Sequence, residues 1–164
     1  MDPVSTKVSA EIDVQRDWFF FWFTAIDLSH VMHRYGPLPG VVGVENQTGP
    51  MHLPGSSRVL LLSDGTTATE QVIGCDPPRQ VDYRLYQLTG LFRHLVDEAR
   101  GQIRFGETPA AGTRVEWRYS FFGRSWVATL VLKMLIPIFW RGFMRSALAR
   151  SLQLAEEEAL NSRG

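Results

Sequence analysis

The chain has 164 residues, of which 45% are hydrophobic and 12% aromatic, so it can bury the core of one domain. Its 17 basic and 17 acidic residues balance, and no net field would attract nucleic acid or another acidic polymer. We therefore expect a single domain over residues 1–164 that does not bind nucleic acid.

The cysteine count and the first residues narrow the class of protein further. Cys75 is the only cysteine, which excludes an internal disulfide and a thiolate metal cluster. Residues 1–10 lack the basic and then apolar run of a secretory signal, and they alternate as a strand does. The stretch 36–43 lacks the lysine and the helix start of a phosphate-binding loop. We expect a cytoplasmic protein with no metal site and no cofactor.

The first predicted elements are a strand and two short helices. Apolar and charged residues alternate from Lys7 to Val14, which predicts a strand with one buried face. The aromatic run Trp18 to Phe23 lies in a helical segment that we predict over 15–27. A second short helix is predicted over 27–34, because glycines and prolines follow it. The two helices would form a clasp after the first strand.

A run of strands follows this clasp. Asp64-Gly65 is a strong hairpin signal, because both residue types tolerate the positive φ of a tight turn. The later strands alternate apolar and charged residues, so they share an apolar inner face and a charged outer face. The predicted strands cover residues 41–45, 58–63, 66–75, 81–86, 98–105 and 114–121.

One long helix is predicted from Trp126 to Leu160. Pro137 should kink or interrupt it, because proline lacks a backbone donor and clashes with the preceding turn. The first half is apolar nearly all round, but Lys133 and Pro137 break the run of about 20 apolar residues that a bilayer span needs. No transmembrane helix is predicted.

The same segment has an unusual charge distribution. No acidic residue lies between Trp117 and Ala155, whereas six basic residues do. Two interpretations are open: the arginines extend from a buried helix into solvent, or the segment makes transient contact with an anionic membrane surface. The sequence favours the first. A partner chain or a second copy in a homodimer is a further candidate for the apolar side of the helix, which includes Phe139, Trp140 and Phe143.

This order of elements resembles a known superfamily. The features are the strand 4–14, the aromatic run 18–23, the turn Asp76-Pro77-Pro78-Arg79, and the stretch 109–117 that leads the last strand toward the long helix. Together they resemble the polyketide cyclase/dehydrase branch of the START-like, Bet v 1-like superfamily. The resemblance implies an α+β helix-grip fold, in which a curved antiparallel sheet wraps around a long C-terminal helix and leaves a cavity between them. Members range from lipid, sterol and quinone carriers to aromatase/cyclases, so fold alone leaves the activity open.

The residues themselves also predict a cavity. Small Ala99 and Gly101 share the inner face with large aromatic residues, a mixture that leaves space. Tyr83 and Tyr119 would supply polar groups, and strand alternation predicts that Asp97 points inward beside them; these three are the catalytic candidates. The residues predicted to contact a ligand are Tyr83, Leu85, Asp97, Ala99, Gly101, Val115, Trp117, Tyr119, Val131, Met134 and Ile138.

Three functions remain open from the sequence. The favoured one is binding or carriage of a hydrophobic small molecule such as a lipid, an isoprenoid or a polyketide-like compound, because no convergent set of titratable groups stands out. The second is a cyclase or dehydratase in which Tyr83, Tyr119 or Asp97 moves a proton. The third is an interaction module that acts through the apolar C-terminal helix.

Overall fold

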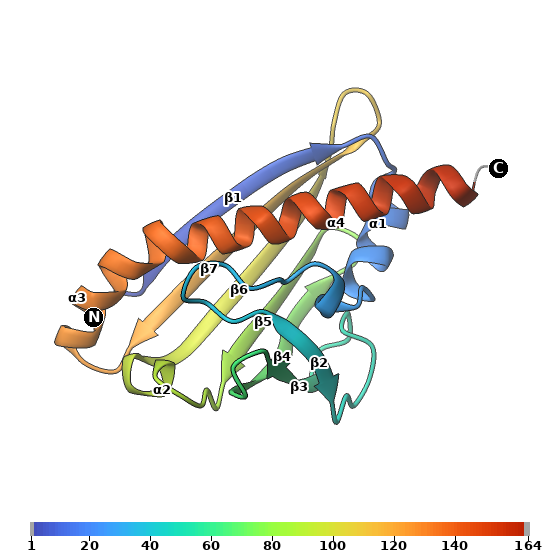
Figure 1. Cartoon of the computed structure of the whole chain (residues 1–164). Helices are drawn as coiled ribbons and strands as arrows, with labels where there is room; N and C mark the ends of the chain where they lie inside the picture. Colours follow the sequence, from blue (N-terminus) through green and yellow to red (C-terminus); the bar gives the residue numbers. More distant parts are fainter. Residues whose placement is uncertain (1, 163–164) are drawn as a thin grey trace.

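A curved antiparallel sheet holds one long helix across its face (Figure 1). The computed structural model describes residues 2–162. Seven strands pair in the order β1-β7-β6-β5-β4-β3-β2, so the first and last strands in sequence lie side by side. The strands are β1 (Val4–Ile12), β2 (Val41–Glu45), β3 (Ser57–Leu62), β4 (Thr67–Asp76), β5 (Gln80–Tyr86), β6 (Val96–Glu107) and β7 (Thr113–Gly123).

This arrangement confirms the α+β helix-grip fold expected from the resemblance. The strands form where they were predicted because alternating apolar residues bury one side of each strand beneath the helix. β6 shows the pattern well, since Ala99, Ile103 and Phe105 are buried and the arginines between them are not. The short helix α2 (Phe92–Leu95), which the sequence did not predict, connects β5 to β6.

The predicted clasp consists of the helix α1 (Arg16–Thr24) and the single 3₁₀ turn η1 (Leu28–His30). The aromatic run of α1 is divided between core and surface. Phe19 and Phe20 are fully buried and pack edge-on against Phe105 of β6, with ring centroids 5.9 and 5.1 Å away. The indole N–H of Trp22 donates to Glu158, so α1 is also joined to the far end of the long helix.

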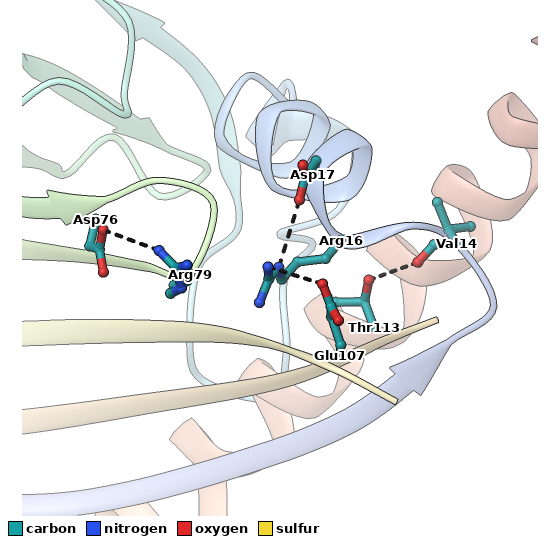
Figure 2. A network of polar contacts seen from close by, with 7 residues as sticks. All are labelled: Val14, Arg16, Asp17, Asp76, Arg79, Glu107 and Thr113. Atoms are coloured by element: carbon teal, nitrogen blue, oxygen red, sulfur yellow. Dashed lines mark hydrogen bonds and ion pairs between the residues drawn. The ribbon is translucent and has the colours of Figure 1, made fainter. Parts of the chain in front are cut away.

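Polar contacts fix the start of α1 against the end of the sheet (Figure 2). The Arg16 guanidinium lies between Asp17, at 3.7 Å, and Glu107 at the end of β6, at 3.0 Å. The Thr113 hydroxyl at the start of β7 donates to the Val14 carbonyl at 2.7 Å and is fully buried. The clasp is thus held by the hairpin that joins β6 to β7.

The long helix runs continuously from 126 to 162 and has three parts: α3 (Trp126–Leu135), the π-helical turn η2 (Ile136–Trp140) and α4 (Arg141–Ser162). Ser125 caps it, because its hydroxyl accepts a hydrogen bond from the Ala128 N–H at 3.1 Å. The irregularity expected at Pro137 takes the form of this π turn, in which the Arg141 N–H donates to the Ile136 carbonyl. Residues four positions apart lie slightly more than one α-helical turn apart, so a buried face made of them drifts around a long helix. The π turn takes up one additional residue and offsets this drift, so the same side of the helix faces the sheet before and after it.

A cavity between sheet and helix

A cavity of about 380 Å³ lies between the sheet and the long helix. This volume lies within the range of small-molecule pockets, about 300 to 1,000 Å³. The inward residues of β3 to β7 form its floor and walls, and η2 with the first turns of α4 forms its roof. Its apolar lining includes Leu60, Leu62, Ala68, Val72, Leu85, Ile103, Phe121, Ile136, Phe139 and Phe143.

A small residue on β6 determines how the tyrosines lie in the cavity. The Tyr83 ring lies over Gly101, and a Cβ added to Gly101 would overlap the ring. In this position the Tyr83 hydroxyl accepts a hydrogen bond from the indole N–H of Trp117 at 2.6 Å. The Tyr119 ring stands edge-on to Tyr83, with centroids 5.7 Å apart. Gly101 therefore positions the aromatic wall without lining the cavity itself.

A buried ion pair lies in the cavity wall. Arg58 on β3 and Glu70 on β4 stand directly opposite each other and both line the cavity. The Nε and Nη2 atoms of Arg58 lie 2.9 and 2.8 Å from Oε1 of Glu70. Only 9% and 11% of these two side chains are exposed. Because removal of one partner would leave a buried unpaired charge, such a pair costs about 3–5 kcal/mol to break.

The two tyrosines in the cavity are neutral hydroxyl groups. Burial raises the pKa of Tyr83 well above its ordinary value, and the nearby Glu70 charge adds to the effect. Burial also raises the pKa of Tyr119, with further contributions from Tyr83 and Glu70. Both groups can therefore exchange hydrogen bonds with a ligand, but neither carries the negative charge of a general base at neutral pH.

One hydrogen-bond donor in the cavity lining is unpaired. Trp140 on η2 lines the cavity and packs edge-on against Tyr119 and Phe121, with centroids 5.2 and 4.9 Å away. Its indole nitrogen is buried and has no hydrogen-bond partner within residues 2–162. A buried donor without a partner costs about 1–3 kcal/mol.

Five of the predicted ligand contacts line the cavity: Tyr83, Leu85, Ala99, Trp117 and Tyr119. Their contact with a ligand stays a prediction.

Two further predicted contacts, Gly101 and Val115, are buried in the sheet but lie outside the lining.

The inward orientation expected for Asp97 is wrong. The pairing of β6 with β7 shifts by one residue between Val96 and Glu98, which marks a β-bulge. Such a bulge reverses the alternation of side chains, so Val96 is buried and 71% of the Asp97 side chain is exposed. The Asp97 carboxylate lies 3.9 Å from Arg124 on the surface. Asp97 is therefore no candidate for acid–base chemistry in the cavity.

The prediction of which side of the helix faces the cavity is also wrong. Val131, Met134 and Ile138 point to solvent, whereas Leu132 and Ile136 are buried. The first half of the helix is apolar on both sides, so its periodicity did not identify the side that packs on the sheet.

Sequence reasoning missed Arg58, Glu70 and Trp140. A signal for the ion pair was present. Arg58 lies two positions before Leu60 on one strand of the hairpin, and Glu70 lies two positions after Ala68 on the other, so each charged residue shares a face with an apolar one. Alternation thus places both charges on the apolar face. Trp140 gave no comparable signal, because its position follows from the π turn.

No group of three or more histidine, cysteine, aspartate or glutamate side chains within residues 2–162 could hold a metal ion.

Comparisons with known proteins agree with the fold around this cavity. The family described as "Polyketide cyclase / dehydrase and lipid transport" matches residues 5–156. No curated protein sequence matches the chain.

Solved structures of similar shape come from several sources. Ginseng major latex-like protein 151 from Panax ginseng has a TM-score of 0.65 at 15% identity, over 93% of this chain and 97% of that chain. Protein MLL2253 from Mesorhizobium loti has a TM-score of 0.65 at 12% identity, over 94% of this chain and 98% of that chain. The structure of Ara h 8.0201 has a TM-score of 0.59 at 12% identity, over 92% of this chain and 99% of that chain.

At these identities the solved structures show the shared fold alone. The family match covers nearly the whole sheet and most of the long helix, which are the elements that enclose the cavity. The chain therefore belongs to the polyketide cyclase/dehydrase and lipid transport family of SRPBCC proteins and shares the Bet v 1-like fold.

Proposed function

We propose that the protein binds and carries a hydrophobic small molecule, such as a lipid, an isoprenoid or a polyketide-like compound, in the cavity between sheet and helix. The observation that carries this proposal is a cavity of about 380 Å³ whose lining is mostly aliphatic and aromatic. The Bet v 1-like fold supports hydrophobic ligand binding in general.

The polar groups of the cavity favour an uncharged ligand. Arg58 and Glu70 neutralise each other, and Tyr83 and Tyr119 are neutral hydroxyls. The other charged residue of the lining, Asp64, is exposed, so a charged ligand would lose its hydration without gaining a buried counter-ion, which is costly in an apolar site. A hydroxyl or carbonyl oxygen would instead exchange hydrogen bonds with Tyr83 or Tyr119, and would accept one from the unpaired Trp140 indole once a turn of the ring brings its nitrogen to the cavity surface. We therefore expect an apolar body with an uncharged oxygen group.

Mass spectrometry of the organic extract tests the proposal. Protein purified under native conditions is compared with the same protein after denaturing purification and refolding. We expect an uncharged, mostly apolar molecule in stoichiometric amount in the native sample only. An empty extract, together with no uptake of a fluorescent long-chain alcohol by the refolded protein, would contradict ligand carriage.

An enzyme of the cyclase or dehydratase kind is a second candidate, and the buried ion pair favours it. Glu70 would take a proton from a carbon next to a ligand carbonyl, and Arg58 would stabilise the enolate oxygen that forms. Glu70→Gln separates the two functions, because it removes the base and keeps a side chain of similar shape. Loss of turnover with retained binding would establish the enzyme, whereas binding without turnover in the unmodified protein supports carriage.

A further inference from the structure

One side of α3 exposes large apolar side chains. We define the α3 face as Trp126, Val127, Leu130, Val131 and Met134 of α3 together with Ile138 of η2, all of them exposed. Trp126 and Met134 are 68% and 69% exposed. The residues follow one another at spacings of three and four, so they form a continuous stripe along the helix. Monomeric soluble proteins rarely leave such a stripe uncovered, and an exposed apolar patch of this kind marks an interaction surface.

The charged residues of the long helix as far as Arg150 are all positive. Lys133 is exposed and follows Leu130 by three positions, so the two are neighbours on the helix surface. Arg141 and Arg145 are exposed on the next turns, and no acidic residue lies in the sequence between Trp117 and Ala155. Arg124, just before the helix, lies 3.9 Å from the Asp97 carboxylate. The charges complement an anionic surface.

The α3 face borders the opening of the cavity. Leu135 and Phe139 line the cavity and directly follow Met134 and Ile138 in the helix. Leu91 also lines the cavity although 84% of it is exposed, and it precedes α2, which packs against α3 at the same end of the molecule (Figure 1). An apolar path therefore leads from the exposed stripe into the cavity.

We propose that the α3 face docks on an anionic lipid bilayer, lying in its interface with the cavity opening toward the lipid. An apolar stripe flanked by cations is the pattern of helices that lie in the membrane interface. The helix from 126 to 162 has the length and composition of a membrane span, but Leu132 and Ile136 on its other side form part of the core. If only the exposed α3 face enters the bilayer interface, the buried side of the helix stays packed in the core. Docking goes beyond ligand carriage and does not require it.

Flotation of the purified protein with vesicles tests the docking. We expect binding to phosphatidylcholine vesicles that contain phosphatidylglycerol, weaker binding to phosphatidylcholine alone, and release at high salt. The double variant Leu130→Glu/Met134→Glu should lower the bound fraction about tenfold, because it places two carboxylates in the apolar stripe. Ile73→Glu is the matched control, since Ile73 is an exposed apolar residue on β4, and it should bind as the unmodified protein does.

The same variants separate membrane docking from ligand carriage and from self-association. Both should keep the far-UV circular dichroism of the unmodified protein, and both should take up a fluorescent long-chain alcohol equally well if ligand carriage is correct. Failure of that uptake alone would contradict carriage and leave docking intact. If the unmodified protein stays free of anionic vesicles, docking is wrong. A concentration-dependent dimer that Leu130→Glu/Met134→Glu dissolves would then assign the α3 face to a second copy of the chain.

Discussion

Gly101 is the residue that allows the aromatic wall of the cavity to form, because the Tyr83 ring occupies the space where a side chain would stand. Gly101→Ala should push the ring aside and break its hydrogen bond with Trp117. We expect a loss of about 1–3 kcal/mol in the free energy of unfolding, the usual cost of overpacking. Urea titration measures it. Gly106→Ala on the same strand is the control, because its new Cβ would come no closer than 3.9 Å to another atom, and it should cost little.

Substitution of Trp140 should leave the stability of the free protein unchanged or raise it, and should lower its affinity for the ligand. Trp140→Phe removes the unpaired indole N–H and keeps an aromatic ring in the wall. Without ligand, the variant should be as stable as the unmodified protein or more so, because the unpaired donor is gone. With ligand, its affinity should fall about tenfold. Thermal unfolding with and without the extracted ligand measures both. An unchanged affinity would show that the indole does not contact the ligand.

At the scale of elements, the π turn explains why the long helix keeps one side on the sheet. Because η2 holds one additional residue, deletion of exposed Pro137 should produce a regular α-helix without rotating α4. We expect this variant to unfold at nearly the same temperature as the unmodified protein. Deletion of exposed Ala149 is the control, because it should turn buried Ser151 and Ala155 away from the sheet and destabilise the protein strongly. Equal losses in both variants would contradict this role of η2.

The elements also show how far the sequence could predict the structure. The alternation of apolar and polar residues was sufficient to predict the strands, because each strand has one apolar side that must be buried. It could not show the bulge before Glu98, which depends on how β6 pairs with β7 and which turns Asp97 outward. It also could not decide which side of α3 faces the sheet, since both sides are apolar. Of the contacts predicted on the strands, five therefore line the cavity, Gly101 and Val115 lie outside the lining, and Asp97 points to solvent, as do the three residues predicted on the helix.

For the molecule as a whole, the two buried tyrosines predict a loss of stability in alkaline solution. Above about pH 10 an unfolded tyrosine releases its proton, whereas Tyr83 and Tyr119, with raised pKa values, keep theirs in the folded protein. The folded state then binds more protons, so the free energy of unfolding falls as the pH rises. Below about pH 10 this contribution is fully present.

Substitution identifies the groups responsible for the alkaline loss. Tyr83→Phe and Tyr119→Phe should each flatten the decrease of the unfolding temperature above about pH 10. Thermal unfolding followed by circular dichroism across this pH range measures the slope, and Tyr86→Phe serves as the control on the same strand as Tyr83. The slope is compared and not the absolute stability, because Tyr83→Phe also removes the acceptor of the Trp117 hydrogen bond. An unchanged slope in both variants would contradict the assignment.

The order of the strands has a consequence for the synthesis of the protein. Within residues 2–162, β1 pairs with β7 alone, and its Ser5 contacts Ser120, 115 positions later in the chain. During translation, β1 therefore stays unpaired, with its apolar residues Val8 and Ile12 uncovered, until most of the chain has left the ribosome. Contacts between such distant segments form slowly, and unpaired strands aggregate easily. We expect the nascent N-terminal strand to be the part of this protein that depends most on chaperones.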